Sequence, residues 1–186
     1  MTEAPFCGIR LLASPGEVMT PRPTTEALVD VCAERIGDRS ALVADVGTGS
    51  GAIAVALALR APHARVWATD TSPGAVALAR ANVCRHSLGD RVSVHHADLL
   101  DGVPPGLDLV VGNLPYLPDS LRAARPELAG EPPEALFATG DGSGPYTRLI
   151  EACSRALRSD GILAIQFHRR ILVTPATDLA ELALAA

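Results

Sequence analysis

The tetrapeptide Asn113-Leu114-Pro115-Tyr116 contains the groups best suited to holding a planar amino group. An amide nitrogen is a poor nucleophile because its lone pair is delocalised into the carbonyl, but two fixed acceptors for its N–H bonds can orient it. The Asn113 side-chain oxygen and the Leu114 carbonyl are two such acceptors, and Pro115 keeps Leu114 out of helical geometry. Tyr116 adds a flat aromatic face. We predict that these four residues are catalytic, although the same residue types also form ordinary turns.

A glycine-rich segment, Asp45-Val46-Gly47-Thr48-Gly49-Ser50-Gly51, has the composition of a cofactor-binding turn. Glycines let the backbone approach a ligand closely, and the first N–H groups of a following helix are free to bind it. With Ala52 the segment also matches the G-x-G-x-x-A fingerprint, so a dinucleotide is one candidate ligand. The cofactor contacts predicted here are Asp45, Gly47, Thr48, Gly49 and Gly51.

Two carboxylates follow at positions that suit an adenosine-containing cofactor. Asp70 lies about 20 residues after the glycines, where nucleotide-binding folds place the acceptor for the ribose hydroxyls. Asp98 can accept from an adenine amino group, and the Leu99 N–H can meet a ring nitrogen. An NAD dehydrogenase is disfavoured because nothing after the strand that ends at Asn113 supplies a proton relay at a suitable position.

These residues must be brought together by the elements between them, which alternate between β-rich and Ala-rich runs. That alternation predicts one α/β domain with a doubly wound parallel sheet, whose strand ends line a single crevice. The predicted strands are 42–46, 66–69, 92–95, 107–112 and 162–167. The predicted helices are 26–36, 52–60, 73–86 and 146–157, with a hairpin over 6–19 and a long loop over 117–144.

The composition narrows the function classes. Hydrophobic residues make up 48% of the chain and aromatic residues only 3%, which suits aliphatic layers between helices and a sheet. The net charge of −5 counts against a nucleic-acid partner, and the absence of Lys excludes a Schiff-base lysine. Four scattered Cys without a C-x-x-C motif predict no metal site. We expect a cytoplasmic protein, because no signal peptide and no membrane-spanning apolar run is evident.

Taken together, these segments resemble the HemK/PrmC family of protein-(glutamine-N5) methyltransferases, from about Phe6 to Phe167. The resemblance is carried by Thr20-Pro21-Arg22-Pro23-Thr24-Thr25-Glu26, Asp45 to Gly51, Thr69-Asp70-Thr71-Ser72, Asn113 to Tyr116, and Glu131-Pro132 through Ala135-Leu136 to Gly140-Asp141-Gly142. The Pro-Arg-Pro stretch is its specific part, because it is not general to methyltransferases.

The resemblance implies a Rossmann-like class I methyltransferase that uses S-adenosyl-L-methionine and releases S-adenosyl-L-homocysteine. It adds Thr71 and Asn113 to the cofactor contacts. It implies that Asn113 and Tyr116 hold the target amide of a protein glutamine or a glutamine-like small molecule. A substrate pocket would be closed by Pro21, Arg22, Pro23, Thr25 and Glu26.

Several departures from the family pattern leave other functions open. Leu114 replaces the usual first proline, and Asn-Leu-Pro-Tyr also resembles the adenine-N6 methyltransferases of ribosomal RNA. The family's N-terminal release-factor-binding domain is expected to be missing, and Gln166 and His168 replace a characteristic Glu and Gly. The alternatives are therefore an adenine-N6 methyltransferase or a non-catalytic paralogue. A separate activator subunit or a homodimer is a further expectation.

Two structural expectations complete the hypothesis. We divide the chain into residues 1–40, a hairpin and helix covering the site, and residues 41–186, the cofactor-binding core. The usual C-terminal hairpin is expected to be short or absent, which would leave the last parallel strand with an open edge. We expect either Ile171–Thr174 or a second subunit to pair there.

Overall fold

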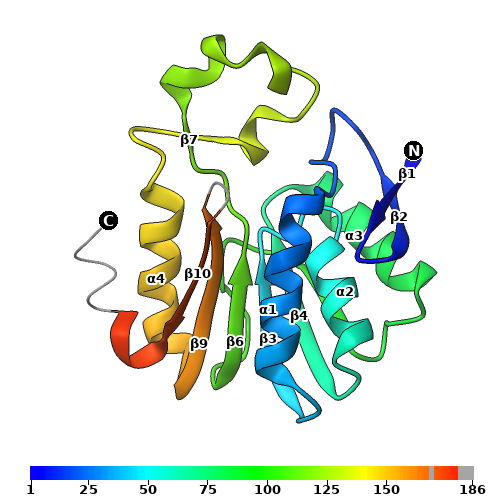
Figure 1. Ribbon diagram of the computed structural model, residues 1–186, viewed down its shortest axis with the longest axis vertical. Coiled ribbons are helices and arrows are strands. Elements are labelled where there is room, and N and C mark those ends of the chain that lie inside the picture. The colour runs from blue at the N-terminus through cyan, green and yellow to red at the C-terminus, as the bar shows by residue number, and fades with distance from the viewer. Residues whose placement is uncertain (168–169, 180–186) are drawn as a thin grey trace.

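The computed structural model describes residues 1–167 and 170–179, which form an α/β fold around one six-stranded sheet (Figure 1). The sheet order is β10-β9-β6-β3-β4-β5, and every neighbouring pair is parallel except β9 with β10. The strands are β3 Ala41–Val46, β4 Ala64–Asp70, β5 Val92–His96, β6 Leu107–Gly112, β9 Leu157–Phe167 and β10 Arg170–Pro175. The predicted doubly wound fold class is confirmed.

Helices cover both faces of this sheet. They are α1 Glu26–Ile36, α2 Ala52–Arg60, α3 Pro73–Arg85 and α4 Gly144–Ala156. On β3, Val43 faces the buried cluster that contains α1, α2 and α3, whereas Ala44 and Val46 belong to the cluster with α4. Alternate residues of a strand point to opposite faces, so a fully apolar strand such as β3 fills two cores. The aliphatic side chains therefore form two core layers, one on each face of the sheet.

Strand β10 pairs with β9 and so covers the open edge expected at the last parallel strand. Ile171 lies opposite Gln166 and Thr174 opposite Leu163 in an antiparallel register. The expectation that Ile171–Thr174 pairs with the last parallel strand is confirmed, and the C-terminal hairpin is short. The predicted departure at His168 lies outside the described residues.

The N-terminal hairpin lies earlier in the chain than predicted. Its strands are β1 Thr2–Phe6 and β2 Ile9–Ala13, joined by Cys7 and Gly8 at φ of 49° and 78°. Two positive φ values give a tight turn whose twist matches that of the strands. The Pro15-Gly16 pair, around which the predicted hairpin over 6–19 was centred, instead forms a turn after β2.

Buried polar contacts fasten this hairpin to the rest of the fold. The Asn82 side chain in α3 accepts from the Leu12 N–H at 2.7 Å and donates to the carbonyls of Leu12 and Ser50, at 3.0 and 2.8 Å. Asn82 thus joins the hairpin to the glycine-rich turn. At the other end, the Glu26 carboxylate accepts from the Cys7 N–H at 3.0 Å.

The predicted long loop over 117–144 contains short elements. β7 Leu117–Pro118 pairs with β8 Phe137–Ala138, and between them lie the 3-10 helices η2 Asp119–Ala124, η3 Pro126–Leu128 and η4 Pro133–Ala135. The remaining 3-10 helices are η1 Pro23–Thr25 and η5 Ala176–Asp178. Figure 1 shows the segment between β7 and α4 projecting beyond the carboxyl ends of the parallel strands.

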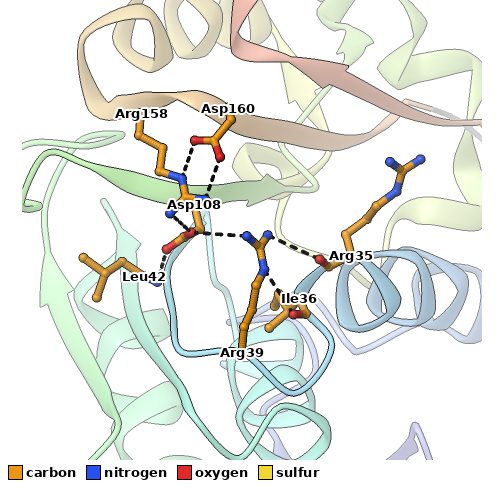
Figure 2. A network of polar contacts seen from close by, with 7 residues as sticks. All are labelled: Arg35, Ile36, Arg39, Leu42, Asp108, Arg158 and Asp160. Carbon is orange, nitrogen blue, oxygen red and sulfur yellow. Dashed lines mark hydrogen bonds and ion pairs between the residues drawn. The ribbon is translucent and has the colours of Figure 1, made fainter.

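A charged network holds the opposite end of the sheet together (Figure 2). The Asp108 carboxylate, 7% exposed, accepts from the Leu42 N–H at 2.7 Å and pairs with Arg158 at 2.6 Å and Arg39 at 3.8 Å. Arg39 also donates to the Ile36 carbonyl at the end of α1. One carboxylate therefore ties β3, β6, β9 and α1 together, far from the strand ends that carry the predicted site.

Candidate active site

The carboxyl ends of four parallel strands line one cavity of about 220 Å³. Gly47 follows β3, Asp70 ends β4, Asp98 follows β5 and Asn113 follows β6. The structure thus brings together the strand-end residues that were predicted to share a crevice. Of the predicted cofactor contacts, those lining this cavity are Gly47, Gly49, Asp70, Thr71, Asp98, Leu99 and Asn113.

The glycine-rich turn is shaped by positions that tolerate no side chain. Gly47 has a φ of 67°, and a Cβ atom there would lie 2.6 Å from the Leu114 Cδ2. Gly51 has a φ of 79°, and its Cβ would lie 3.1 Å from the Ala79 Cα. Left-handed backbone and close neighbours together require glycine. The turn therefore packs against both α3 and the tetrapeptide.

Asp45, Thr48 and Gly51 do not line the cavity. Asp45 is completely buried beneath the turn, where one carboxylate oxygen accepts from the Thr48 hydroxyl at 2.6 Å and the Ala54 N–H at 3.0 Å. Its other oxygen meets no hydrogen-bond donor in the described chain. Burial raises the pKa of Asp45 to about 7 against these two hydrogen bonds. In this structure Asp45 supports the turn from behind.

Asp70 is held rigidly at the cavity wall. One oxygen accepts from the Gly49 N–H at 2.8 Å and the other from the Ser72 N–H at 2.9 Å. Ser72 in turn caps α3 by accepting from the Ala75 N–H at 3.3 Å, as its sequence position predicted. Each carboxylate oxygen can accept more than one hydrogen bond, so both can also bind hydroxyl groups of a ligand.

The far end of the cavity is formed by Asp98 and Leu99. Asp98 pairs with Arg148 of α4, which also lines the cavity. Leu99 adopts a left-handed conformation with a φ of 48°, and its carbonyl accepts from the Thr69 hydroxyl at 2.6 Å. Sequence reasoning missed Arg148, because no local motif links a helical arginine to a strand end 50 residues earlier.

The tetrapeptide presents its two predicted acceptors in defined surroundings. The Asn113 side-chain nitrogen donates to the Thr25 hydroxyl at 3.3 Å, so its oxygen lies at the opposite end of the amide group. The Leu114 carbonyl accepts from the Tyr146 hydroxyl at 3.0 Å. Tyr116 packs against Phe167, with ring centroids 5.2 Å apart. Both acceptors are therefore fixed by residues outside the tetrapeptide.

A second cavity of about 430 Å³ lies on the other side of the tetrapeptide. Its walls include the predicted residues Arg22, Pro23 and Tyr116. The first and second cavities are both lined by Met19, Asn113, Leu114 and Ala135, whereas Pro115 lines only the first of the two. Asn113 and Leu114 thus stand between two spaces, as acceptors between a cofactor and a substrate would.

Pro21, Thr25 and Glu26 of the predicted pocket do not line the second cavity. Pro21, Arg22 and Thr25 line a small space of about 60 Å³ next to the glycine-rich turn. Glu26 lines none of these three cavities, because its carboxylate binds the hairpin turn. Its place in a substrate pocket stays a prediction.

Glu131 connects the projecting segment to the predicted pocket. Its carboxylate accepts from the Thr20 N–H at 3.1 Å and lies 3.9 Å from the Arg22 guanidinium. The segment that begins at Thr20 is thereby held over the strand ends. In residues 1–167 and 170–179, no three His, Cys, Asp or Glu side chains lie together as metal ligands. Within the same residues no helix has the length and apolarity needed to cross a membrane.

Comparison with known proteins places these features in a family. The model of the methyltransferase small domain matches residues 22–141. The release factor glutamine methyltransferase of Geobacter sulfurreducens is 40% identical over 166 residues, which cover 87% of this chain and 56% of the relative. That of Deinococcus radiodurans is 37% identical over 179 residues, covering 95% and 63%. The chain spans little more than half the length of these relatives.

Solved structures show a similar fold at low sequence identity. The ribosomal protein L11 methylase of Lactobacillus delbrueckii subsp. bulgaricus superimposes with a TM-score of 0.58 at 24% identity, covering 90% of this chain and 70% of that one. The precorrin-6y C5,15-methyltransferase of Geobacter metallireducens gives 0.54 at 19% identity, covering 80% and 67%. These likenesses concern the fold alone.

Proposed function

The chain belongs to the methyltransferase small-domain family, and we propose that it transfers a methyl group from S-adenosyl-L-methionine to the side-chain amide nitrogen of a protein glutamine. The observation that carries this proposal is the position of Asn113 and Leu114 between two cavities. The two relatives are named as release factor glutamine methyltransferases, which supports glutamine as the acceptor and makes a release factor the first substrate to test. Both relatives are longer than this chain. Such a reaction would take place in the cytoplasm.

The first cavity fits the cofactor by the chemistry of its walls. The Asp70 carboxylate would accept from the ribose hydroxyls, and Asp98 and Leu99 would meet the adenine edge. Gly47 and Gly49 would let the backbone approach the methionine part closely. When bound, the cofactor supplies a methyl carbon that bonds to the amide nitrogen as its carbon–sulfur bond breaks, with the electron pair staying on sulfur and one nitrogen proton going to water.

The protein's contribution to this transfer is alignment. The Asn113 side-chain oxygen and the Leu114 carbonyl would accept the two N–H groups of the amide, which fixes its plane and its distance from the first cavity. Two carbonyl-type oxygens also stabilise the positive charge that develops on the nitrogen. Tyr116 would pack against the planar group from the second cavity.

An adenine-N6 methyltransferase is the second candidate, because an exocyclic amino group would meet the same two acceptors. The Asn-Leu-Pro-Tyr sequence favours it, and the excess of 21 acidic over 16 basic residues opposes it. Incubation with labelled cofactor, a purified release factor and total RNA separates the two. Label on a glutamine supports the proposed function, and label on adenine shows that the protein is an adenine-N6 methyltransferase instead.

Asn113→Ala and titration with S-adenosyl-L-homocysteine complete the test. The variant is expected to lose methyl transfer, because the acceptor oxygen is gone. It should still bind this product, with a smaller loss of affinity, because Asn113 is one wall residue of the first cavity and the glycine-rich turn remains. Full transfer by Asn113→Ala would contradict the mechanism. Product binding by the wild-type protein without transfer to any protein, RNA or small-molecule fraction would instead indicate the non-catalytic paralogue. If adding cell extract restores transfer, the protein needs an activator subunit.

A further inference from the structure

Each of the two acceptor oxygens is associated with a buried hydroxyl group from another part of the chain. Thr25, at the end of η1, is 6% exposed and bonds to the Asn113 amide group. Tyr146, in the first turn of α4, is 5% exposed and bonds to the Leu114 carbonyl. Neither hydroxyl belongs to the tetrapeptide. Thr25 precedes α1, whose buried side chains pack in one core cluster, and Tyr146 belongs to the other cluster, with α4.

The Thr25 hydroxyl holds the Asn113 side chain in one rotamer. A threonine at this position before a helix commonly caps the helix with its side chain, but Thr25 makes no such bond to α1. Its oxygen instead accepts from the Asn113 side-chain nitrogen. In this structure the Thr25 hydroxyl bonds the nitrogen end of the amide, and this contact holds the Asn113 side chain in the rotamer that leaves its oxygen at the other end. Here the oxygen is left for a substrate N–H.

The Tyr146 hydroxyl sets the orientation of the Leu114 carbonyl. Its oxygen lies 3.0 Å from the Leu114 oxygen and 2.6 Å from the Gln166 backbone oxygen, so its single proton is shared between them. Burial raises the pKa of Tyr146 above its usual value, which keeps the hydroxyl a donor. A carbonyl oxygen has two lone pairs, so the Leu114 oxygen can still accept from a substrate.

We propose that Thr25 and Tyr146 are positioning residues that aim the two acceptor oxygens at the substrate amino group. This inference rests on the proposed methyl transfer, because only a planar N–H₂ group needs both acceptors in one plane. A misplacement of about 1 Å at a reacting centre can cost on the order of 10²-fold in rate. The hydroxyls therefore act on the rate of transfer and leave cofactor binding unchanged.

The test compares isosteric and conservative variants. Thr25→Val and Tyr146→Phe keep the packing but remove the hydroxyl, and each is expected to lower kcat by roughly 10- to 100-fold. The affinity for S-adenosyl-L-homocysteine should change less than about twofold, since neither residue lines the first cavity. Thr25→Ser should restore kcat. Thr174→Val, which alters a buried threonine in β10, is the matched control and should keep wild-type kcat.

A second readout does not depend on activity. Hydrogen exchange of the Asn113 side-chain N–H₂ protons, assigned by their loss in Asn113→Asp, should accelerate in Thr25→Val but not in Thr174→Val or Thr25→Ser. An inactive wild-type protein would defeat the proposed function, and this exchange would still decide the role of Thr25. If wild-type protein is active and Thr25→Val keeps both its kcat and its slow exchange, the inference is overturned.

Discussion

Gly142 makes the closest approach to the tetrapeptide of any glycine in the described chain, and its replacement gives a sharp prediction. It has a φ of 90°, and a Cβ atom there would overlap the Tyr116 carbonyl oxygen and lie 2.9 Å from the Tyr116 carbonyl carbon. Gly140, two residues earlier, has a φ of 68° and no atom within 4 Å of its virtual Cβ. Comparing alanine variants at Gly140 and Gly142 therefore separates the cost of backbone strain from the cost of a steric clash with Tyr116.

The expected magnitudes follow from these two environments. Gly140→Ala should cost only the left-handed strain of an alanine, about 1–2 kcal/mol. Gly142→Ala should cost similar strain plus roughly 1–3 kcal/mol for displacing the Tyr116 backbone. In a protein of this size each kcal/mol lowers Tm by about 2–4 °C. Because Tyr116 must shift, methyl transfer should also fall on the order of tenfold in Gly142→Ala and stay near wild type in Gly140→Ala.

Thermal unfolding followed by circular dichroism, together with initial rates of methyl transfer, measures both effects. Equal losses of Tm in the two variants would show that φ strain alone accounts for Gly142. A Gly142→Ala protein with the expected Tm loss and full activity would refute the placement of Tyr116 in the site.

Three further predictions use other contacts. Burial raises the pKa of Asp45 in the folded state to about 7 from 3.8, so the folded protein binds this proton more tightly than the unfolded chain does. The stability gained from this proton is fully present below about pH 4 and is lost as the pH rises through 7. Asp45→Asn should remove that loss, seen as urea midpoints that fall less between about pH 5 and pH 8 than those of wild type. Asp108→Ala should cost about 1–3 kcal/mol in urea unfolding, because it leaves the Leu42 N–H without its buried acceptor. Asp160→Ala should cost little, because its 71% exposed carboxylate forms a surface pair with Arg158. Gly47→Ala and Leu114→Ala should be non-additive in stability by at least about 1 kcal/mol, because the smaller Leu114 side chain makes room for the new Cβ; additive losses would deny their contact.

The sheet and its strand ends could be predicted because their signals are local. Strands β3, β4 and β6 are short, largely apolar runs, and a small or polar residue marks the carboxyl end of each: Gly47 follows β3, Asp70 ends β4 and Asn113 follows β6. The hairpin boundaries were wrong because the turn uses Cys7 and Gly8, which lack the Asn-Gly or Asp-Gly signal of such turns. Pro15-Gly16 is the stronger sequence signal and marks a different turn.

Residues that act through distant contacts could not be predicted. Tyr146 reaches the Leu114 carbonyl from a helix that begins at Gly144, and its separation of 32 residues from Leu114 matches no motif. The role of Glu26 is the opposite case. It stands within a recognisable stretch, but the register of the folded hairpin gives its carboxylate the Cys7 N–H as partner. Side-chain direction thus depends on packing that residue order alone does not specify.

Leu114, which departs from the family's proline, shows how one position serves both cavities. Its buried side chain meets the turn at Gly47, while its carbonyl is bound by Tyr146. In the proposed mechanism a substrate would meet the carbonyl, and a backbone oxygen is present whatever the residue type. We therefore expect a leucine in place of proline to affect the contact with the glycine-rich turn and to leave the acceptor in place. An amide and an adenine amino group would use that oxygen alike. We therefore expect the walls of the second cavity, where Arg22 and Arg125 lie, to discriminate between the two.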